Sequence, residues 1–116
     1  MEIIRLTGSA VGRNRAVAFG DLVFTVATAG DAGDDLKAQA AASLATIDRN
    51  LAELGSDKSR IVQATVYLRE IRRKAGFDEV WNPWIGPDPS AWPQRACIGV
   101  ALAGDDQVEI VVIAAR

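Results

Sequence analysis

Arg95 lies in residues 93–97 (PQRAC), directly before an apolar run that continues to the last residue. Arginine is seldom buried unless a partner neutralises its charge, so a guanidinium here needs a carboxylate. Its planar fork can hold a carboxylate through two parallel hydrogen bonds, which lysine cannot do. The carboxylate could belong to the protein, as a structural ion pair at an interface, or to a small acidic ligand. The residues alone favour neither.

Glu109 is the second charged residue in an apolar setting. It alternates with Val111, Ile113 and Ala115 along one face of a predicted strand. A carboxyl group in such a place needs a partner or takes a raised pKa, and either condition can serve a function.

The spacing between these two residues predicts a shared site between subunits. We expect residues 94–102 and 107–115 to form a hairpin around AGDDQ. Glu109 would then lie opposite Ala101, six residues beyond Arg95. That separation is roughly 20 Å along a strand. The two side chains could therefore act together only if they come from different subunits.

Cys97 is the only cysteine, and the chain contains no histidine. This composition excludes serine–histidine–aspartate and cysteine–histidine catalysis. It also excludes most zinc and iron sites, so we expect no metal and no cofactor. A lone cysteine is more often a small core residue than a nucleophile. Its backbone carbonyl, beside Arg95, could still hold a water.

Length and composition indicate a single domain over residues 1–116. The 49% of hydrophobic and 24% of charged residues are typical of a globular protein. A net charge of −2 argues against nucleic-acid binding through phosphate contacts. No segment has the pattern of a signal peptide or a membrane helix, and one cysteine cannot form an internal disulfide. The cytoplasm is therefore the expected location.

Hydrophobic patterning predicts the element order β-β-β-α-β-α-β-β. The strands are expected, besides the two named above, at residues 2–6, 15–19, 22–28 and 61–68. Apolar residues at spacings of three and four predict a helix of about twenty residues, capped by Asp34 and stopped by Gly55. Residues 69–84 predict a second helix that ends near Pro83.

Two helices can cover only one face of a six-stranded sheet, yet both faces of the predicted last strand are apolar. A large exposed apolar patch marks an interface. Burying roughly 1,000 Å² or more of it would be normal for a permanent oligomer. The sequence therefore predicts an α+β domain whose free sheet face is closed by other subunits.

Three further features have simpler interpretations. The basic run at residues 69–74 is expected to be a solvated helix start, diluted by Glu70 and Asp78. Trp81, Trp84 and Trp92 are expected to pack the second helix and its loop. The acidic segment at residues 104–106 has the composition of a turn and is a poor metal site.

Several segments together resemble the reactive intermediate deaminases, the Rid or YjgF family. The resemblance rests on PQRAC followed by QVEIVVIAA, on GSDKSRIVQATVYL and on AVAFGDLVFT, and it covers nearly the whole chain. It is closest to a branch with tryptophan near Trp81 and Trp84. The resemblance implies a chorismate-mutase-like α+β fold, with a six-stranded sheet and two helices on one face. It also implies a homotrimer with ligand clefts between subunits.

The resemblance also implies an activity. The best-known reaction of the family is hydrolysis of 2-imino or enamine acids to 2-keto acids and ammonia, without metal or cofactor. The chain would then be a 2-iminobutanoate/2-iminopropanoate deaminase-like hydrolase acting on C=N bonds. Carried over, Arg95 would bind the substrate carboxylate and the backbone at Cys97 would position the attacking water. Glu109 would polarise or deprotonate that water.

The chain departs from the family pattern at three positions, where Arg13 replaces a tyrosine, Val26 a serine and Asp78 an asparagine. Arg13 and Asp78 are thus further candidate substrate-binding residues, and Arg13 in the cleft would suit a second acid group on the substrate. One alternative is a non-catalytic trimer that binds small carboxylates as a sensor or chaperone. Another is RNA cleavage, with a local patch of Arg13, Arg15 and Arg72.

Overall fold

The computed structural model describes residues 1–116, and the predicted element order is confirmed. Its strands are β1 (Ile3–Thr7), β2 (Asn14–Phe19), β3 (Leu22–Thr28), β4 (Ile61–Leu68), β5 (Gln94–Gly99) and β6 (Val108–Ala115). Its two α-helices are α1 (Leu36–Glu53) and α2 (Lys74–Ile85). No helix combines the length and the apolar character that a membrane crossing requires.

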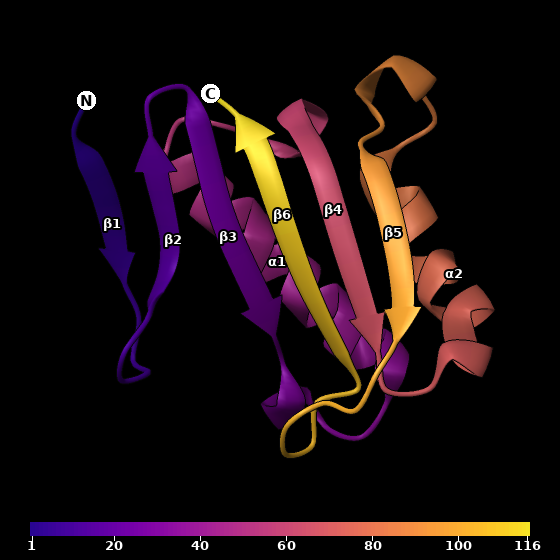
Figure 1. Cartoon of the computed structure of the whole chain (residues 1–116). Helices are drawn as coiled ribbons and strands as arrows, with labels where there is room; N and C mark the ends of the chain where they lie inside the picture. The colour runs from indigo at the N-terminus through magenta and orange to yellow at the C-terminus, as the bar shows by residue number, and fades with distance from the viewer.

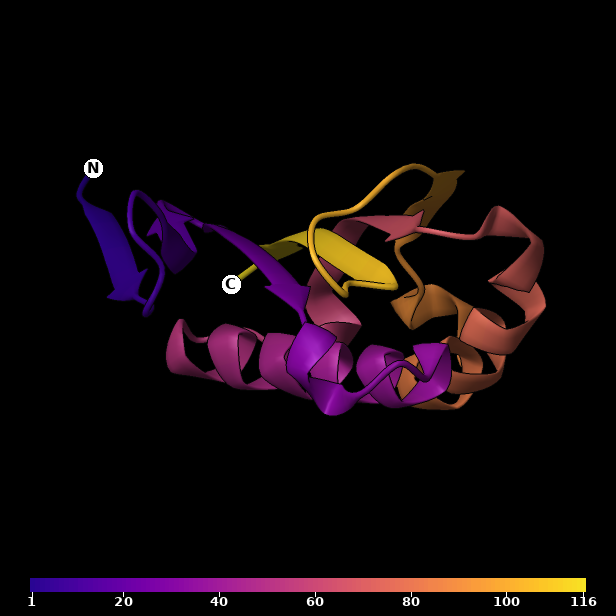
Figure 2. The same cartoon turned by 90° about the horizontal axis from the view of Figure 1, so that it is seen from below.

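The six strands form one mixed sheet in the order β1-β2-β3-β6-β4-β5 (Figure 1). Turned by 90°, the molecule shows two layers, with α1 and α2 together on one side of the sheet (Figure 2). This confirms the predicted α+β class, with a six-stranded sheet and two helices on one face.

The predicted hairpin between the last two strands is wrong. β5 pairs in parallel with β4 at the edge of the sheet, and β6 lies between β3 and β4, antiparallel to both. A strand that is apolar on both faces gains most from an interior position, which explains why β6 takes it. The helix α2 supplies the crossover that parallel β4 and β5 require. β5 also ends at Gly99 rather than at residue 102.

The helix boundaries differ slightly from the prediction. Asp35, and not Asp34, caps α1, where its side chain accepts a hydrogen bond from the backbone N–H of Lys37 at 3.2 Å. α2 begins at residue 74, because residues 71–73 form a 3-10 turn. It continues two residues past Pro83, whose missing N–H leaves a carbonyl free at the exposed Glu79.

The hydrophobic core lies between the sheet and the two helices. Buried residues of α1 pack on buried residues of β3, β4 and β6, and Phe77 and Trp81 of α2 close the core beside β5. The buried residues of β4 and β6 lie on the same face of the sheet, as the register of Ala64 with Val112 illustrates.

The opposite face of the sheet has no helix on it and is largely apolar. Phe24 lies opposite Val17 and Ile113, and it remains 38% exposed. A register shift near the start of β4 puts Ile61 in the core and turns the neighbouring Val62 outward. The uncovered apolar face that the sequence predicted is therefore present.

Candidate functional site

Arg95 points to the helix-covered face of the sheet. It pairs with Ala64 on β4, and Ala64 faces the core. The guanidinium carbon lies 5.1 Å from the ring centroid of Trp81 and 5.7 Å from that of Phe77. Both rings belong to α2, so the helix places two aromatic side chains against the cation. Cation–π contacts of this kind hold a guanidinium in a defined place.

Asp78 of α2 supplies the carboxylate that Arg95 needs. Arg95 Nη1 lies 2.8 Å from Asp78 Oδ1, and Lys74 Nζ donates a hydrogen bond to Asp78 Oδ2 at 2.9 Å. The Arg95 contact is an ion pair by distance, but its direction leaves Oδ1 without a well-aligned hydrogen bond. Arg95 is therefore neutralised within the chain while its N–H donors stay available for a second carboxylate.

The Asp78 carboxyl group remains ionised at neutral pH. Burial acts to raise its pKa, but the Lys74 hydrogen bond and the nearby Arg95 cation outweigh that effect. Its pKa consequently lies below the ordinary value of 3.8. The negative charge thus persists beside Arg95.

Cys97 lies on the same strand face as Arg95, opposite Val66. Burial raises the pKa of its thiol above the ordinary 9.0, although Arg95 opposes the shift. The thiol is therefore protonated at neutral pH and is a poor nucleophile.

The backbone of Val100 donates to the Leu68 carbonyl at 3.0 Å. This hydrogen bond means that the backbone groups of Val100 face β4. Because backbone groups alternate in direction from one residue to the next along a strand, the N–H and C=O of Cys97, three residues earlier, point to the free edge of β5.

Asp78 and Arg95 line a pocket of about 550 Å³. The other walls come from the last turns of α2 and from the segment that leads into β5. Most of that lining is apolar, and it includes Trp81, Ile85, Pro87, Trp92 and Pro93. The pocket thus combines one cation with aromatic and aliphatic walls.

Glu109 lies on the other face of the sheet, opposite Thr28 of β3 and Tyr67 of β4. It lines a second pocket, of about 570 Å³, together with Arg13 and Val26. The opening exists because β3 continues beyond its last β2 pair, so Val26 and Thr28 have no β2 neighbour. Three of the residues singled out in the sequence therefore come together here.

The predicted site residues form two groups that do not meet within one chain. Arg95, Asp78 and Cys97 gather under α2, whereas Arg13 and Glu109 gather at the end of β3. The expectation that Glu109 lies opposite Ala101 is wrong, because β5 and β6 are not neighbours. The side chains of Arg95 and Glu109 are instead kept apart because they project from opposite faces of the sheet.

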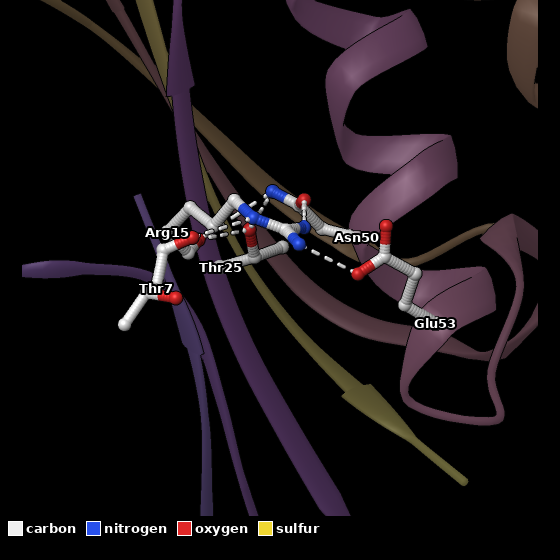
Figure 3. Close-up of polar contacts among 5 residues, drawn as sticks. All are labelled: Thr7, Arg15, Thr25, Asn50 and Glu53. Carbon is white, nitrogen blue, oxygen red and sulfur yellow. Dashed lines mark hydrogen bonds and ion pairs between the residues drawn. The ribbon is translucent and has the colours of Figure 1, made fainter. Parts of the chain in front are cut away.

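The proposed RNA-binding patch is not supported by the geometry. Arg15 donates to Asn50 Oδ1 and to Glu53 Oε2, both at 2.6 Å, and to the Thr7 carbonyl at 3.1 Å (Figure 3). Arg72 is paired with Glu70 at 2.8 Å. Two of the three cations are therefore engaged in contacts within the chain.

Sequence reasoning missed the role of Arg69, which was assigned to a solvated helix start. Its guanidinium donates to the carbonyls of Leu102, Gly104 and Asp106 at 2.8 to 2.9 Å. It thereby fixes the loop between β5 and β6, which contributes Asp106 to the Glu109 pocket.

The ion pair of Asp78 with Arg95 was also missed. One available signal was the three-residue spacing that puts Asp78 and Trp81 on one helix side.

Comparison with known proteins identifies the family. A sequence profile described as Endoribonuclease L-PSP matches residues 8–116. A RutC family protein of Haemophilus ducreyi is 38% identical over 86 residues, which is 73% of this chain and 72% of that protein. TdcF of Escherichia coli K12, provisionally named a reactive intermediate deaminase, is 27% identical over 123 aligned positions, covering 100% and 95% of the two chains.

A solved structure agrees. NMB1025 of Neisseria meningitidis, described as a member of the YjgF protein family, superimposes with a TM-score of 0.90 at 34% identity. The match covers 100% of this chain and 96% of that one. The chain therefore belongs to the Endoribonuclease L-PSP family, which is the Rid/YjgF family that its sequence resembles. Membership supports a deaminase-type activity at the level of the family.

Proposed function

We propose that the protein is a hydrolytic deaminase that converts 2-imino and enamine acids to 2-keto acids and ammonia. The observation that carries the proposal is Arg95, a cation that lies beside two aromatic rings, inside a pocket, with N–H donors free for a second carboxylate. A guanidinium in this state suits a substrate carboxylate. The name of the TdcF relative supports the reaction class.

The reaction proceeds through a carbinolamine. Arg95 binds the carboxylate and so fixes the C=N carbon beside the free edge of β5. A water held by the Cys97 carbonyl attacks that carbon, Glu109 accepts a proton from the water, and Glu109 passes this proton to the imine nitrogen, which gives the carbinolamine. Transfer of the remaining hydroxyl proton to nitrogen then expels ammonia and leaves the 2-keto acid. One water is consumed, and no histidine, metal or redox partner takes part.

The site is completed by a neighbouring copy of the chain. Arg95 and Glu109 project from opposite faces of the sheet, so a single chain cannot place both against one substrate. The uncovered apolar face, which includes Phe24, offers the contact surface. In a closed homotrimer, each Arg95 pocket would meet the Glu109 pocket of the next subunit.

A second candidate is a non-catalytic trimer that binds small carboxylates. Arg95 lines its pocket without Glu109, which projects from the other face of the sheet, so binding of an acid needs fewer groups than turnover does. In that case acids would still bind at Arg95, but imines would decay at the same rate with and without the protein.

A direct assay tests the proposed function. 2-Iminopropanoate is generated from alanine by an amino-acid oxidase, and its decay is timed with and without protein. We expect faster decay with the protein. Arg95→Lys and Arg95→Ala should each lower the rate about 30-fold or more, because a charged hydrogen-bonding partner is lost.

Arg49→Ala is the matched control for these variants, since Arg49 is exposed on α1 and lines neither pocket. It should leave the rate unchanged. Unaltered decay with the native protein, together with pyruvate binding that depends on Arg95, would replace the deaminase by the carboxylate-binding trimer.

A further inference from the structure

Trp92 is an exposed tryptophan with a fixed orientation. It is 52% exposed, so it packs only in part against the second helix and its loop, where the sequence placed it. Its indole Nε1–H donates to the carbonyl of Gly86 at 2.8 Å. Gly86 has a φ of 88°, a value open to glycine, and this turn ends α2. The hydrogen bond therefore holds the Trp92 ring in place at the pocket wall.

The rest of the wall is held in place too. Pro87 and Pro93 restrict the backbone on both sides of the loop that carries Trp92. Trp81 is only 5% exposed, and its ring lies 6.0 Å from that of Phe77 and 5.2 Å from that of Trp84. The walls of the pocket are thus formed before any ligand arrives, which lowers the entropic cost of binding.

The size of the pocket exceeds the needs of a small imino acid. Its volume of about 550 Å³ lies in the range of sites for drug-sized molecules. A three-carbon acid on Arg95 would lie beside Trp81, whose ring centroid is 5.1 Å from the guanidinium carbon, and would leave most of that space empty. Besides Asp78 and Arg95, the polar side chain in the lining is Asn82. The remainder therefore suits an apolar group, and a flat ring fits against tryptophan.

We propose that this pocket selects 2-imino or enamine acids that bear an aromatic side chain, with Trp92 as the specificity-determining residue. The inference rests on the proposed function in that Arg95 binds the substrate carboxylate. With the carboxylate on Arg95, the side chain of the acid extends between the rings of Trp81 and Trp92. Imines derived from phenylalanine and the other aromatic amino acids are then the preferred class.

Binding of stable products provides the first test. Pyruvate and phenylpyruvate differ by one phenyl ring, and each can be titrated into the ¹⁵N-labelled protein while the indole N–H signals are followed by NMR. We expect phenylpyruvate to bind about tenfold or more tightly, since the ring buries apolar area. The Trp92 signal, assigned by its loss in Trp92→Phe, should move with phenylpyruvate and hardly at all with pyruvate.

Variants of the tryptophans make the test specific. Trp92→Ala should remove most of the preference for phenylpyruvate over pyruvate and leave the affinity for pyruvate unchanged. Trp92→Phe should keep most of that preference. Trp84→Phe is the control, because Trp84 lines no pocket and its Nε1–H donates to Asp48 of α1 at 3.0 Å. Equal affinity for both acids in the native protein would overturn the inference. An equal loss of affinity for both acids in Trp92→Ala would also overturn the inference.

The same experiments separate this inference from the deaminase proposal. Imines made from alanine and phenylalanine are compared in the decay assay beside the titrations. Equal rates and equal affinities for the two would leave the deaminase standing and refute the aromatic pocket. A Trp92-dependent preference for phenylpyruvate without any turnover would refute the deaminase and leave the aromatic pocket standing. Tighter binding of oxaloacetate than of phenylpyruvate would also refute it, and would make Arg13 the selecting residue.

Discussion

Arg95 gains its chemical character from α2 more than from its own strand. The strand only turns it toward the helix layer, whereas α2 supplies the two rings, and Asp78 sets the charge that a ligand meets. An incoming carboxylate must share Arg95 with Asp78. The hydrogen bond from Lys74 keeps Asp78 paired when it does so. The residue at position 78 therefore tunes how strongly acids bind.

Asp78→Asn should strengthen acid binding. Removing the anion beside Arg95 takes away a repulsion, and for a partly exposed, screened charge we expect about two- to fivefold tighter pyruvate binding. The gain should shrink as salt is added. Calorimetric titration of both forms measures it. Glu79→Gln, which removes an exposed carboxylate one residue away, is the control and should change nothing. Weaker binding by Asp78→Asn would mean that Asp78 positions Arg95 for the ligand.

The Cys97 thiol should be unreactive at neutral pH. Because burial raises its pKa, the thiolate fraction at any pH below that value is smaller than for an ordinary cysteine. The rate of alkylation by iodoacetamide, followed by mass spectrometry, should reach half its maximum above pH 9.0. A half-maximum below that pH would contradict the assignment. Cys97→Ala should keep most of the deaminase activity, because only the backbone carbonyl is assigned a role.

At the scale of elements, local patterning predicted each strand and helix but not every neighbour. Apolar spacing located α1, and short apolar runs located β2 and β3, because both patterns depend on residues close in sequence. The pairing of β5 could not be found this way. Sequence adjacency favoured a hairpin with β6, whereas burial of both β6 faces decided the topology.

The site was predictable to a similar degree. Arg95 and Glu109 stood out because each is a charge in an apolar strand. The contact of Asp78 with Arg95 joins a helix to a strand, so it depends on tertiary packing that no local pattern encodes. The pocket wall at Trp92 depends on how the loop folds back onto Gly86.

Asn50 clamps α1 to the β2–β3 hairpin. Its amide accepts from Arg15 and donates to Thr25 Oγ1 at 2.9 Å, as Figure 3 shows, and it is buried. Asn50→Ala should lower the free energy of unfolding by about 1–3 kcal/mol, because buried partners are left unpaired. Urea unfolding at fixed protein concentration measures the loss. The neighbouring exposed Arg49→Ala should cost little, and an equal effect of both would contradict the clamp.

At the scale of the whole molecule, we expect the uncovered sheet face to bind other copies of the chain. Analytical ultracentrifugation at micromolar concentration should give three times the monomer mass. Phe24→Glu, which puts a charge on that face, should shift the protein toward monomers and lower activity with it. Ala41→Glu, on the exposed side of α1, should leave both unchanged. A native monomer would refute the assembly.

Subunit complementation tests the central claim, that Arg95 of one chain and Glu109 of another serve one substrate. Arg95→Ala and Glu109→Ala should each be nearly inactive alone. Refolding them together in equal amounts lets native Arg95 and native Glu109 meet across some interfaces. In a random trimer, about one quarter of the sites regain both, so 2-iminopropanoate hydrolysis should return to roughly a quarter of the native rate. A mixture no more active than its two components would contradict a site shared between subunits.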